Sequence, residues 1–239
     1  MNPLPIEQRG YTQPELLADT KWLSRHISDD NLRVIDARSS KDYAEVHIPG
    51  AVNLNGYSGV PRDASGDMAD PSIFEERVRK LGINNDTTVV VYDAPSQMMG
   101  TIAWGFMYHG HTNVKILDGG LAKWMMEGNT VSQDKSEYPP GNFTASPDNN
   151  IYCSLEDAKK VINDEHSIFW DTRSIEEYEG TAASVIDGPK LRQGHIPGAV
   201  HLDWKELFDE ENKTLKPANE LRTLLESHGI KPEDEVSTY

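Results

Sequence analysis

Two long blocks of this amino-acid sequence match each other, one in each half of the chain. RVIDARSSKDYAEVHIPGAVNL, at residues 33–54, recurs at residues 168–202 as IFWDTRSIEEYEG…LRQGHIPGAVHL. The second copy carries an insertion, TAASVIDGPKLRQG, ahead of its histidine. Further along, KLGINNDTTVVVY at residues 80–92 recurs as SHGIKPEDEVSTY at residues 227–239. A repeat of this length indicates two duplicated domains rather than a solenoid of short units.

Local patterns have the same order in both halves. A short apolar strand is followed by an acidic helical turn, a second short strand, a helix and a buried strand. Strands that alternate with helices indicate a parallel sheet covered on both faces, so we predict an α/β fold with tandem domains. We place the domains at residues 1–129 and 151–239. Residues 130–150 are rich in Pro, Ser and Asn, which is typical of a linker.

Capping signals place the helix starts. Thr12 with Glu15 predicts a helix over PELLADTKWLSRHI, and Ser154 with Asp157 predicts one over LEDAKKVI. Asp70 stands immediately ahead of Pro71 at the start of SIFEERVRKLG, which is another N-terminal signal.

Charge and composition exclude some classes of function. The 239 residues include 39 acidic and 23 basic side chains, a formal net charge of -16, which argues against a nucleic-acid partner. A site for an anion must therefore be built locally, from arginines or backbone N–H groups. No signal peptide or membrane-spanning run is visible. Cys153 is the single cysteine, which fits a reducing compartment, and we expect a cytoplasmic protein without a membrane partner.

The repeat also predicts the structural position of the last residue. Tyr239 is the counterpart of Tyr92, which precedes Asp93 at the carboxyl end of a strand. Ligands of open α/β sheets bind outside these strand ends. The second half has no counterparts of residues 93–124. We therefore expect the chain to be a fragment, or to be interrupted at a modified residue, with its second domain incomplete immediately ahead of the functional position.

The paired D-x-R…HIPGA blocks, VVVYDAPSQ and LDGGLAKW resemble the two-domain rhodaneses, which are thiosulfate and 3-mercaptopyruvate sulfurtransferases. The resemblance implies that the N-terminal domain is catalytically silent, with Asp93 where the active domain has cysteine. It also implies a catalytic cysteine immediately after Tyr239, so that residues 1–239 contain no catalytic residue and are inactive.

The activity implied by the resemblance is transfer of a sulfane sulfur through a cysteine persulfide. The donor is a small anion, thiosulfate or 3-mercaptopyruvate. The acceptor is cyanide or a thiol, with thioredoxin-like proteins among the candidates. We expect no cofactor and no metal.

Arginines are the candidates for binding the anionic donor. Related sulfurtransferases use arginines from the region of Arg192, which could alternatively form a plain surface salt bridge. Arg173 is a second candidate, although Arg173 and Arg38 are expected mainly to pair with nearby carboxylates. Glu179 stands in the stretch where mercaptopyruvate-type enzymes commonly carry an arginine, which weakens the assignment of 3-mercaptopyruvate as the donor.

The repeated motif residues are expected to be structural. Asp36 and Asp171 end strands and should hold loops through backbone N–H groups. His47 and His195 both precede Ile-Pro-Gly, and the recurrence of this histidine in the silent half favours a structural role. Cys153 is expected to be an inert small residue, because nothing basic is adjacent to it.

Other interpretations stay open. His109 and His111 could bind a metal, but their spacing favours a surface turn. The chain could be a non-catalytic rhodanese-like binding or regulatory module. It could also be a phosphatase of this fold, whose active loop is one residue longer in the family. The tandem HIPGA blocks favour a sulfurtransferase.

Overall fold

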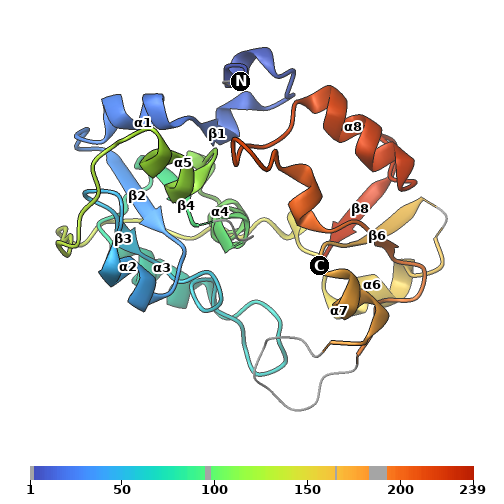
Figure 1. The fold of residues 1–239 in the computed structure, drawn as a ribbon. Helices are drawn as coiled ribbons and strands as arrows, with labels where there is room; N and C mark the ends of the chain where they lie inside the picture. The colour runs from blue at the N-terminus through green and yellow to red at the C-terminus, as the bar shows by residue number, and fades with distance from the viewer. Residues whose placement is uncertain (1–2, 95–97, 165, 183–192) are drawn as a thin grey trace. The chain divides into compact units, whose positions relative to one another are not determined.

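The computed structural model of the chain divides into two compact units. The first comprises residues 1–152 and 210–214, and the second comprises residues 153–209 and 215–239. In both units strands alternate with helices (Figure 1). The structure describes all residues except 1–2, 95–97, 165 and 183–192.

The first unit is built on a five-stranded sheet in the order β1-β5-β4-β2-β3. These strands are β1 (Leu17–Ala18), β2 (Leu32–Asp36), β3 (Val52–Asn53), β4 (Thr88–Tyr92) and β5 (Val114–Leu117). Every neighbouring pair is parallel, as the alternation of strands and helices predicted. The register pairs Asp36 with Tyr92, so that both strand ends lie at the same edge.

Helices cover both faces of this sheet (Figure 1). They are α1 (Thr20–His26), α2 (Ser40–Glu45), α3 (Pro71–Arg79), α4 (Met98–Tyr108) and α5 (Gly120–Met126), with 3-10 turns at Ile6–Gln8, Pro14–Leu16 and Asn149–Ile151. Val89 and Val91 of β4 pack with Phe74 of α3. Val90 points to the opposite face and packs with Leu23 of α1. The helices α4 and α5 complete these two faces, respectively.

The second unit repeats the centre of the first. Its described strands are β6 (Ser167–Asp171), β7 (Val200–His201) and β8 (Glu235–Thr238), and its helices are α6 (Leu155–Val161), α7 (Ile175–Glu179) and α8 (Ala218–Ser227), with a 3-10 turn at Trp204–Leu207. The order β7-β6-β8 is parallel throughout and matches β3-β2-β4. In Figure 1, α7 and α8 lie on opposite sides of these strands. The tandem α/β prediction is therefore confirmed.

Helix capping differs from the prediction at the first helix. Thr12 and Glu15 do not open a long helix; Leu17 and Ala18 instead form the edge strand β1, paired with the end of β5. The helix begins only after Asp19, whose carboxylate accepts the backbone N–H of Trp22 at 2.6 Å. Pairing with a distant strand overrides the local pattern here.

The other predicted helix starts are present. Ser154 and Asp157 form a complete capping box at α6, and the Asp70 side chain accepts the backbone N–H of Ser72 at α3. Within the described part of the chain, no helix combines the length and the apolar character that crossing a membrane requires.

The segment 130–150, expected to link the domains, packs along the first unit. Ser132 and His47 exchange two backbone hydrogen bonds, at 2.8 and 2.9 Å. The Tyr138 ring lies 3.5 Å from the guanidinium carbon of Arg33, and Phe143 is buried in the core. The segment therefore completes the covering of the first unit.

His109 and His111 lie in the core and not at a surface turn. Both side chains are buried, and the His109 ring stacks on Phe74 with 4.0 Å between ring centroids. Burial lowers the pKa of both imidazoles. Nδ1 of His109 lies 2.7 Å from the Gly105 carbonyl oxygen, whereas its Nε2 has no hydrogen-bond partner. The apolar neighbours of these rings explain why they turn inward.

Tyr92 ties the end of β4 to two other segments. Its hydroxyl donates to Oδ2 of Asp36 at 2.8 Å and accepts the backbone N–H of Ile48 at 3.0 Å. Burial, together with the adjacent Asp36 carboxylate, raises the pKa of Tyr92 far above its usual value. The hydroxyl therefore stays protonated and can serve both partners at once.

We expect Tyr92→Phe to destabilise the protein. The change leaves the buried N–H of Ile48 without its acceptor and removes a donor from Asp36, at a cost of about 1–3 kcal/mol in the free energy of unfolding. Chemical unfolding measures the loss. Tyr57→Phe is the matched control, because the Tyr57 side chain is exposed. Equal stabilities of the two variants would contradict the role of the Tyr92 hydroxyl.

We also expect the protein to lose stability as the pH falls below about 6.5, the ordinary histidine pKa of the unfolded chain. Because the folded pKa of His109 is lowered, the unfolded state binds more protons in this range. The thermal midpoint, measured from pH 7.5 to 5, should fall less in His109→Phe, which keeps the stacking on Phe74. His166→Asn, at an exposed position, should behave like the unmodified protein. If the thermal midpoint of His109→Phe falls with pH as much as that of the unmodified protein, His109 is not a cause of the loss of stability.

Candidate functional site

An aspartate–arginine clamp closes the turn after β2 in the first unit. The buried carboxylate of Asp36 accepts three groups of Arg38: the backbone N–H at 3.0 Å, Nε at 2.9 Å and Nη2 at 2.5 Å. Burial by itself lowers the pKa of Arg38, but the bonds to Asp36 outweigh it and raise that pKa. Arg38 also donates to the Val46 carbonyl, which joins the turn to the segment ahead of His47.

The second unit carries the same clamp. Asp171 accepts the backbone N–H of Arg173 at 3.0 Å, its Nε at 2.9 Å and its Nη2 at 2.6 Å, and Nη2 also donates to the Gly194 carbonyl at 2.9 Å. Burial raises the pKa of Asp171, but the bonds from Arg173 outweigh it and lower that pKa. Arg173 is thus held by the protein itself, with only 27% of its side chain exposed.

Tyr239 occupies the place of Tyr92. Its hydroxyl accepts the backbone N–H of Ile196 at 3.0 Å, as the hydroxyl of Tyr92 accepts that of Ile48. Burial and a hydrogen bond to Asp171 raise the pKa of Tyr239. The equivalence of the two tyrosines, inferred from the repeat, therefore holds in the hydrogen bonds as well as in the strand order.

These bonds explain why HIPG recurs in both halves. The isoleucine N–H binds the tyrosine hydroxyl, and the histidine ring stacks on the tyrosine of the preceding helix. His47 stacks on Tyr43 at 4.0 Å between centroids, and His195 on Tyr178 at 3.7 Å. Nδ1 of each histidine lies within 2.8 Å of that tyrosine's carbonyl oxygen. In this geometry each histidine connects the HIPG loop to the helix that precedes it, beside the strand ends.

Asp93 follows Tyr92 directly at the carboxyl edge of the sheet and is buried. Its Oδ2 accepts the backbone N–H of Met99 in the first turn of α4 at 3.1 Å, and its carbonyl accepts that of Leu121 at 2.9 Å. Gly120, with φ +54°, packs so closely that an added Cβ would lie 2.4 Å from the Asp93 carbonyl oxygen. In the first unit, a carboxylate therefore occupies this strand end and binds a backbone N–H in the first turn of α4.

One pair of edge residues was missed at the sequence level. Asn53, at the end of β3, donates to the carbonyls of Asp36 and Arg38, both at 2.9 Å. At the equivalent place in β7, Nε2 of His201 lies 2.9 Å from the Arg173 carbonyl oxygen. The AVNL and AVHL repeats contain the signal, since a polar residue ends both of these short strands.

The remaining candidates are Arg192, Cys153 and Glu179. Arg192 falls in the undescribed segment 183–192. Cys153 is exposed ahead of α6, and Glu179 is the last residue of α7. In the described residues, no group of three or more His, Cys, Asp or Glu side chains is arranged to hold a metal ion.

Comparison with known proteins shows which family has this sequence pattern. The model of the rhodanese-like domain matches residues 19–127 and 154–239. The sulfur carrier protein TtuD of Thermus thermophilus is 33% identical over 241 residues, covering 96% of this chain and 84% of that protein. A Mycobacterium bovis protein assigned provisionally as the thiosulfate sulfurtransferase SseA is 31% identical over 251 residues, covering 99% of this chain and 82% of its own length.

A solved structure agrees with these sequence matches. The crystal structure of SseA from Escherichia coli, described among 3-mercaptopyruvate sulfotransferases, aligns with a TM-score of 0.80 at 26% identity. The alignment covers 93% of this chain and 87% of that one. With both halves matched by the family model and the same clamp built twice, the chain belongs to the two-domain rhodanese family.

Proposed function

We propose that this protein is a sulfurtransferase that moves a sulfane sulfur from thiosulfate to cyanide or a thiol through a cysteine persulfide. The observation that carries the proposal is the placement of Tyr239 beside Asp171, equivalent to that of Tyr92 beside Asp36. The names of the relatives, a sulfur carrier protein and thiosulfate sulfurtransferases, support sulfur transfer as the general activity.

The nucleophile in this proposal is a cysteine at the position that follows Tyr239 in a gene product continuing beyond that residue. The equivalent position in the first unit is Asp93, at a strand end and in contact with a backbone N–H of α4. Backbone N–H groups and a helix N-terminus lower the pKa of a thiol, which favours the thiolate. A carboxylate at this position is a poor sulfur nucleophile and repels an anionic donor.

The proposed reaction has two steps. The thiolate attacks the outer sulfur of thiosulfate; the S–S bond breaks, and sulfite leaves with the electron pair. The enzyme then carries a persulfide, whose negative charge the backbone N–H groups stabilise. Cyanide attacks the outer sulfur of the persulfide, which forms thiocyanate and returns the cysteine thiolate. A thiol acceptor follows the same path and leaves as its own persulfide.

Binding of the donor requires local positive charge in a chain of net charge -16. Arg173 already donates to Asp171 and Gly194, so we assign it to holding the loop. This leaves Arg192, in the insertion of the second repeat, as the proposed contact for the anionic donor. Glu179, in place of an arginine, supports thiosulfate over 3-mercaptopyruvate. A non-catalytic binding module is the alternative, and the activity assay below separates the two.

We expect residues 1–239 to show no thiosulfate:cyanide sulfurtransferase activity, whereas a longer gene product should be active. After incubation with thiosulfate, the intact mass of the longer protein should rise by one sulfur atom. Cys153→Ser is the control and should leave the activity of the longer protein unchanged. Turnover by residues 1–239 that Cys153→Ser abolishes would show that the active site is assigned wrongly. An inactive longer protein would favour the binding module.

In the active, longer protein, Arg192→Ala should raise KM for thiosulfate about tenfold or more. The expected loss is one charge-assisted contact, worth about 1.5–3 kcal/mol. Steady-state kinetics at matched ionic strength provide the measurement. Lys231→Ala, which removes an exposed positive charge from the same unit, should leave KM unchanged. If both variants retain the KM of the unmodified protein, Arg192 is a surface residue without a role in donor binding.

A further inference from the structure

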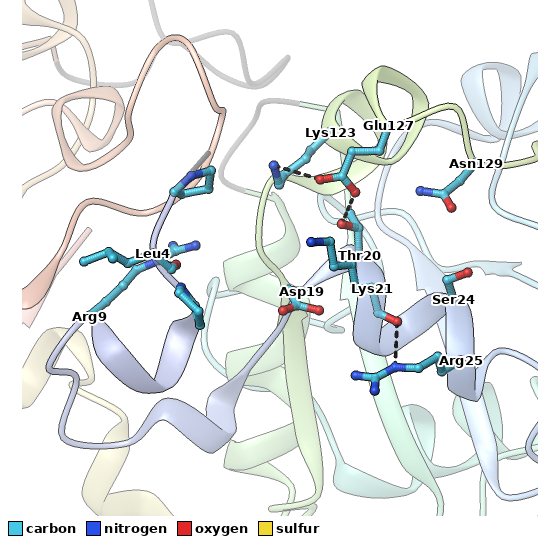
Figure 2. A pocket seen from close by; sticks show the side chains of 12 residues that line it. Leu4, Arg9, Asp19, Thr20, Lys21, Ser24, Arg25, Lys123, Glu127 and Asn129 are labelled. Atoms are coloured by element: carbon cyan, nitrogen blue, oxygen red, sulfur yellow. Dashed lines mark hydrogen bonds and ion pairs between the residues drawn. The ribbon is translucent and has the colours of Figure 1, made fainter. Parts of the chain in front are cut away.

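The first unit contains a pocket away from its aspartate–arginine clamp. It lies beyond the carboxyl ends of β1 and β5, between the N-terminal segment, α1 and the end of α5 (Figure 2). Its volume is about 790 Å³, which is within the range of small-molecule sites. In open α/β sheets this is the edge at which ligands bind.

One wall of the pocket is an N-terminal segment fixed by a buried ion pair. Nη1 of Arg9 lies 2.6 Å from Oδ2 of Asp118, at the end of β5. Nε of Arg9 donates to the Leu4 carbonyl at 2.7 Å, which holds the segment in place. Leu4 and Pro5 bring an apolar surface to this wall, and the Leu4 side chain is 54% exposed.

The opposite wall contains a carboxylate that its own neighbours neutralise. One Glu127 oxygen lies 3.0 Å from Nζ of Lys123, and the other accepts the Thr20 hydroxyl (Figure 2). Burial raises the pKa of Glu127, but these hydrogen bonds and the charges of Lys123 and Lys21 outweigh it and lower that pKa. Glu127 is therefore ionised, with both oxygens already engaged by the protein.

Lys21 and Arg25 supply further positive charge on the same side of the pocket, although the charge of Lys21 also acts on Glu127. They lie one turn apart on α1, are both exposed, and line the pocket. Within the described part of the chain, neither forms an ion pair with a carboxylate. The lining has two further cationic side chains, but Arg9 is paired with the buried Asp118 and Lys123 with Glu127. After the carboxylate of Asp19 is counted, Lys21 and Arg25 leave an excess of one positive charge. The excess of positive charge is local, since the chain as a whole carries -16.

We propose that this pocket binds a small polyanion, a molecule with two or more carboxylate or phosphate groups. Lys21 and Arg25 bind the charged groups, and the surface of Leu4 and Pro5 contacts the rest of the ligand. The carboxylate of Asp19 is already engaged, because it accepts the N–H of Trp22. This inference does not depend on the sulfurtransferase proposal, because every residue that lines the pocket belongs to the first unit.

Titration calorimetry of residues 1–239 with citrate, and separately with pyrophosphate, tests the site. We expect saturable binding of at least one of the two, weakened about tenfold or more in the double variant Lys21→Gln/Arg25→Gln. The matched control is Lys41→Gln/Lys80→Gln, which changes the net charge of the same unit equally but alters lysines paired with Glu45 and Glu76. The control should bind like the unmodified protein.

Amide chemical-shift mapping on the unmodified protein provides a second measurement that does not depend on the folding of a variant. The largest changes on addition of the anion should fall in residues 20–25 and at Asn129. Three results would overturn the proposal: no saturable binding of either anion at about 10 mM, equal weakening in the two double variants, or shift changes confined to another part of the chain. If both double variants bind the anion equally weakly, binding depends on the overall charge of the unit and not on Lys21 and Arg25.

Discussion

A buried carboxylate at the end of a central strand is the interaction on which both units depend. Asp36 and Asp171 are fully removed from solvent. Each is compensated by an arginine two residues later and by a tyrosine at the end of the neighbouring strand, β4 or β8. Removal of one member from such a buried group leaves an uncompensated charge, which costs far more than a surface ion pair contributes. The same tyrosine hydroxyl binds the isoleucine of HIPG, so a single cluster joins two strand ends and a loop.

The two units share this cluster of aspartate, arginine, tyrosine and HIPG loop, but they differ in the residues around it. In the first, the position after the tyrosine holds Asp93, and the segment 130–150 covers His47, whose Nε2 lies 3.0 Å from the Asp134 carbonyl oxygen. In the second, His195 is exposed, and His201 replaces the amide of Asn53 at the strand end. The cluster holds the strand ends in both units. A difference in chemistry between the units must therefore come from the few other residues at the carboxyl edge of each sheet.

An acidic chain can bind the proposed anionic ligands only where its charge is compensated locally. With 39 acidic and 23 basic residues, the average surface repels thiosulfate and similar anions. At the proposed polyanion pocket the structure engages the acidic group Glu127, which is held by Thr20 and Lys123. Local positive charge then comes from a few arginines and lysines, and not from the overall composition.

The amino-acid sequence by itself determined the tandem α/β architecture, the equivalence of Tyr92 and Tyr239, and the family resemblance, because these depend on the order of motifs along the chain. Adjacent caps, such as Ser154 with Asp157, could also be read from the sequence. Tertiary structure decided what depends on distant partners. Leu17 and Ala18 form a strand through their pairing with β5, and His109 lies inside the core, where its ring stacks on Phe74. Segment 130–150 has the composition of a linker, yet it packs on the first unit. Its partners there, among them Arg33 and His47, lie about a hundred residues earlier in the chain, so local composition does not indicate them.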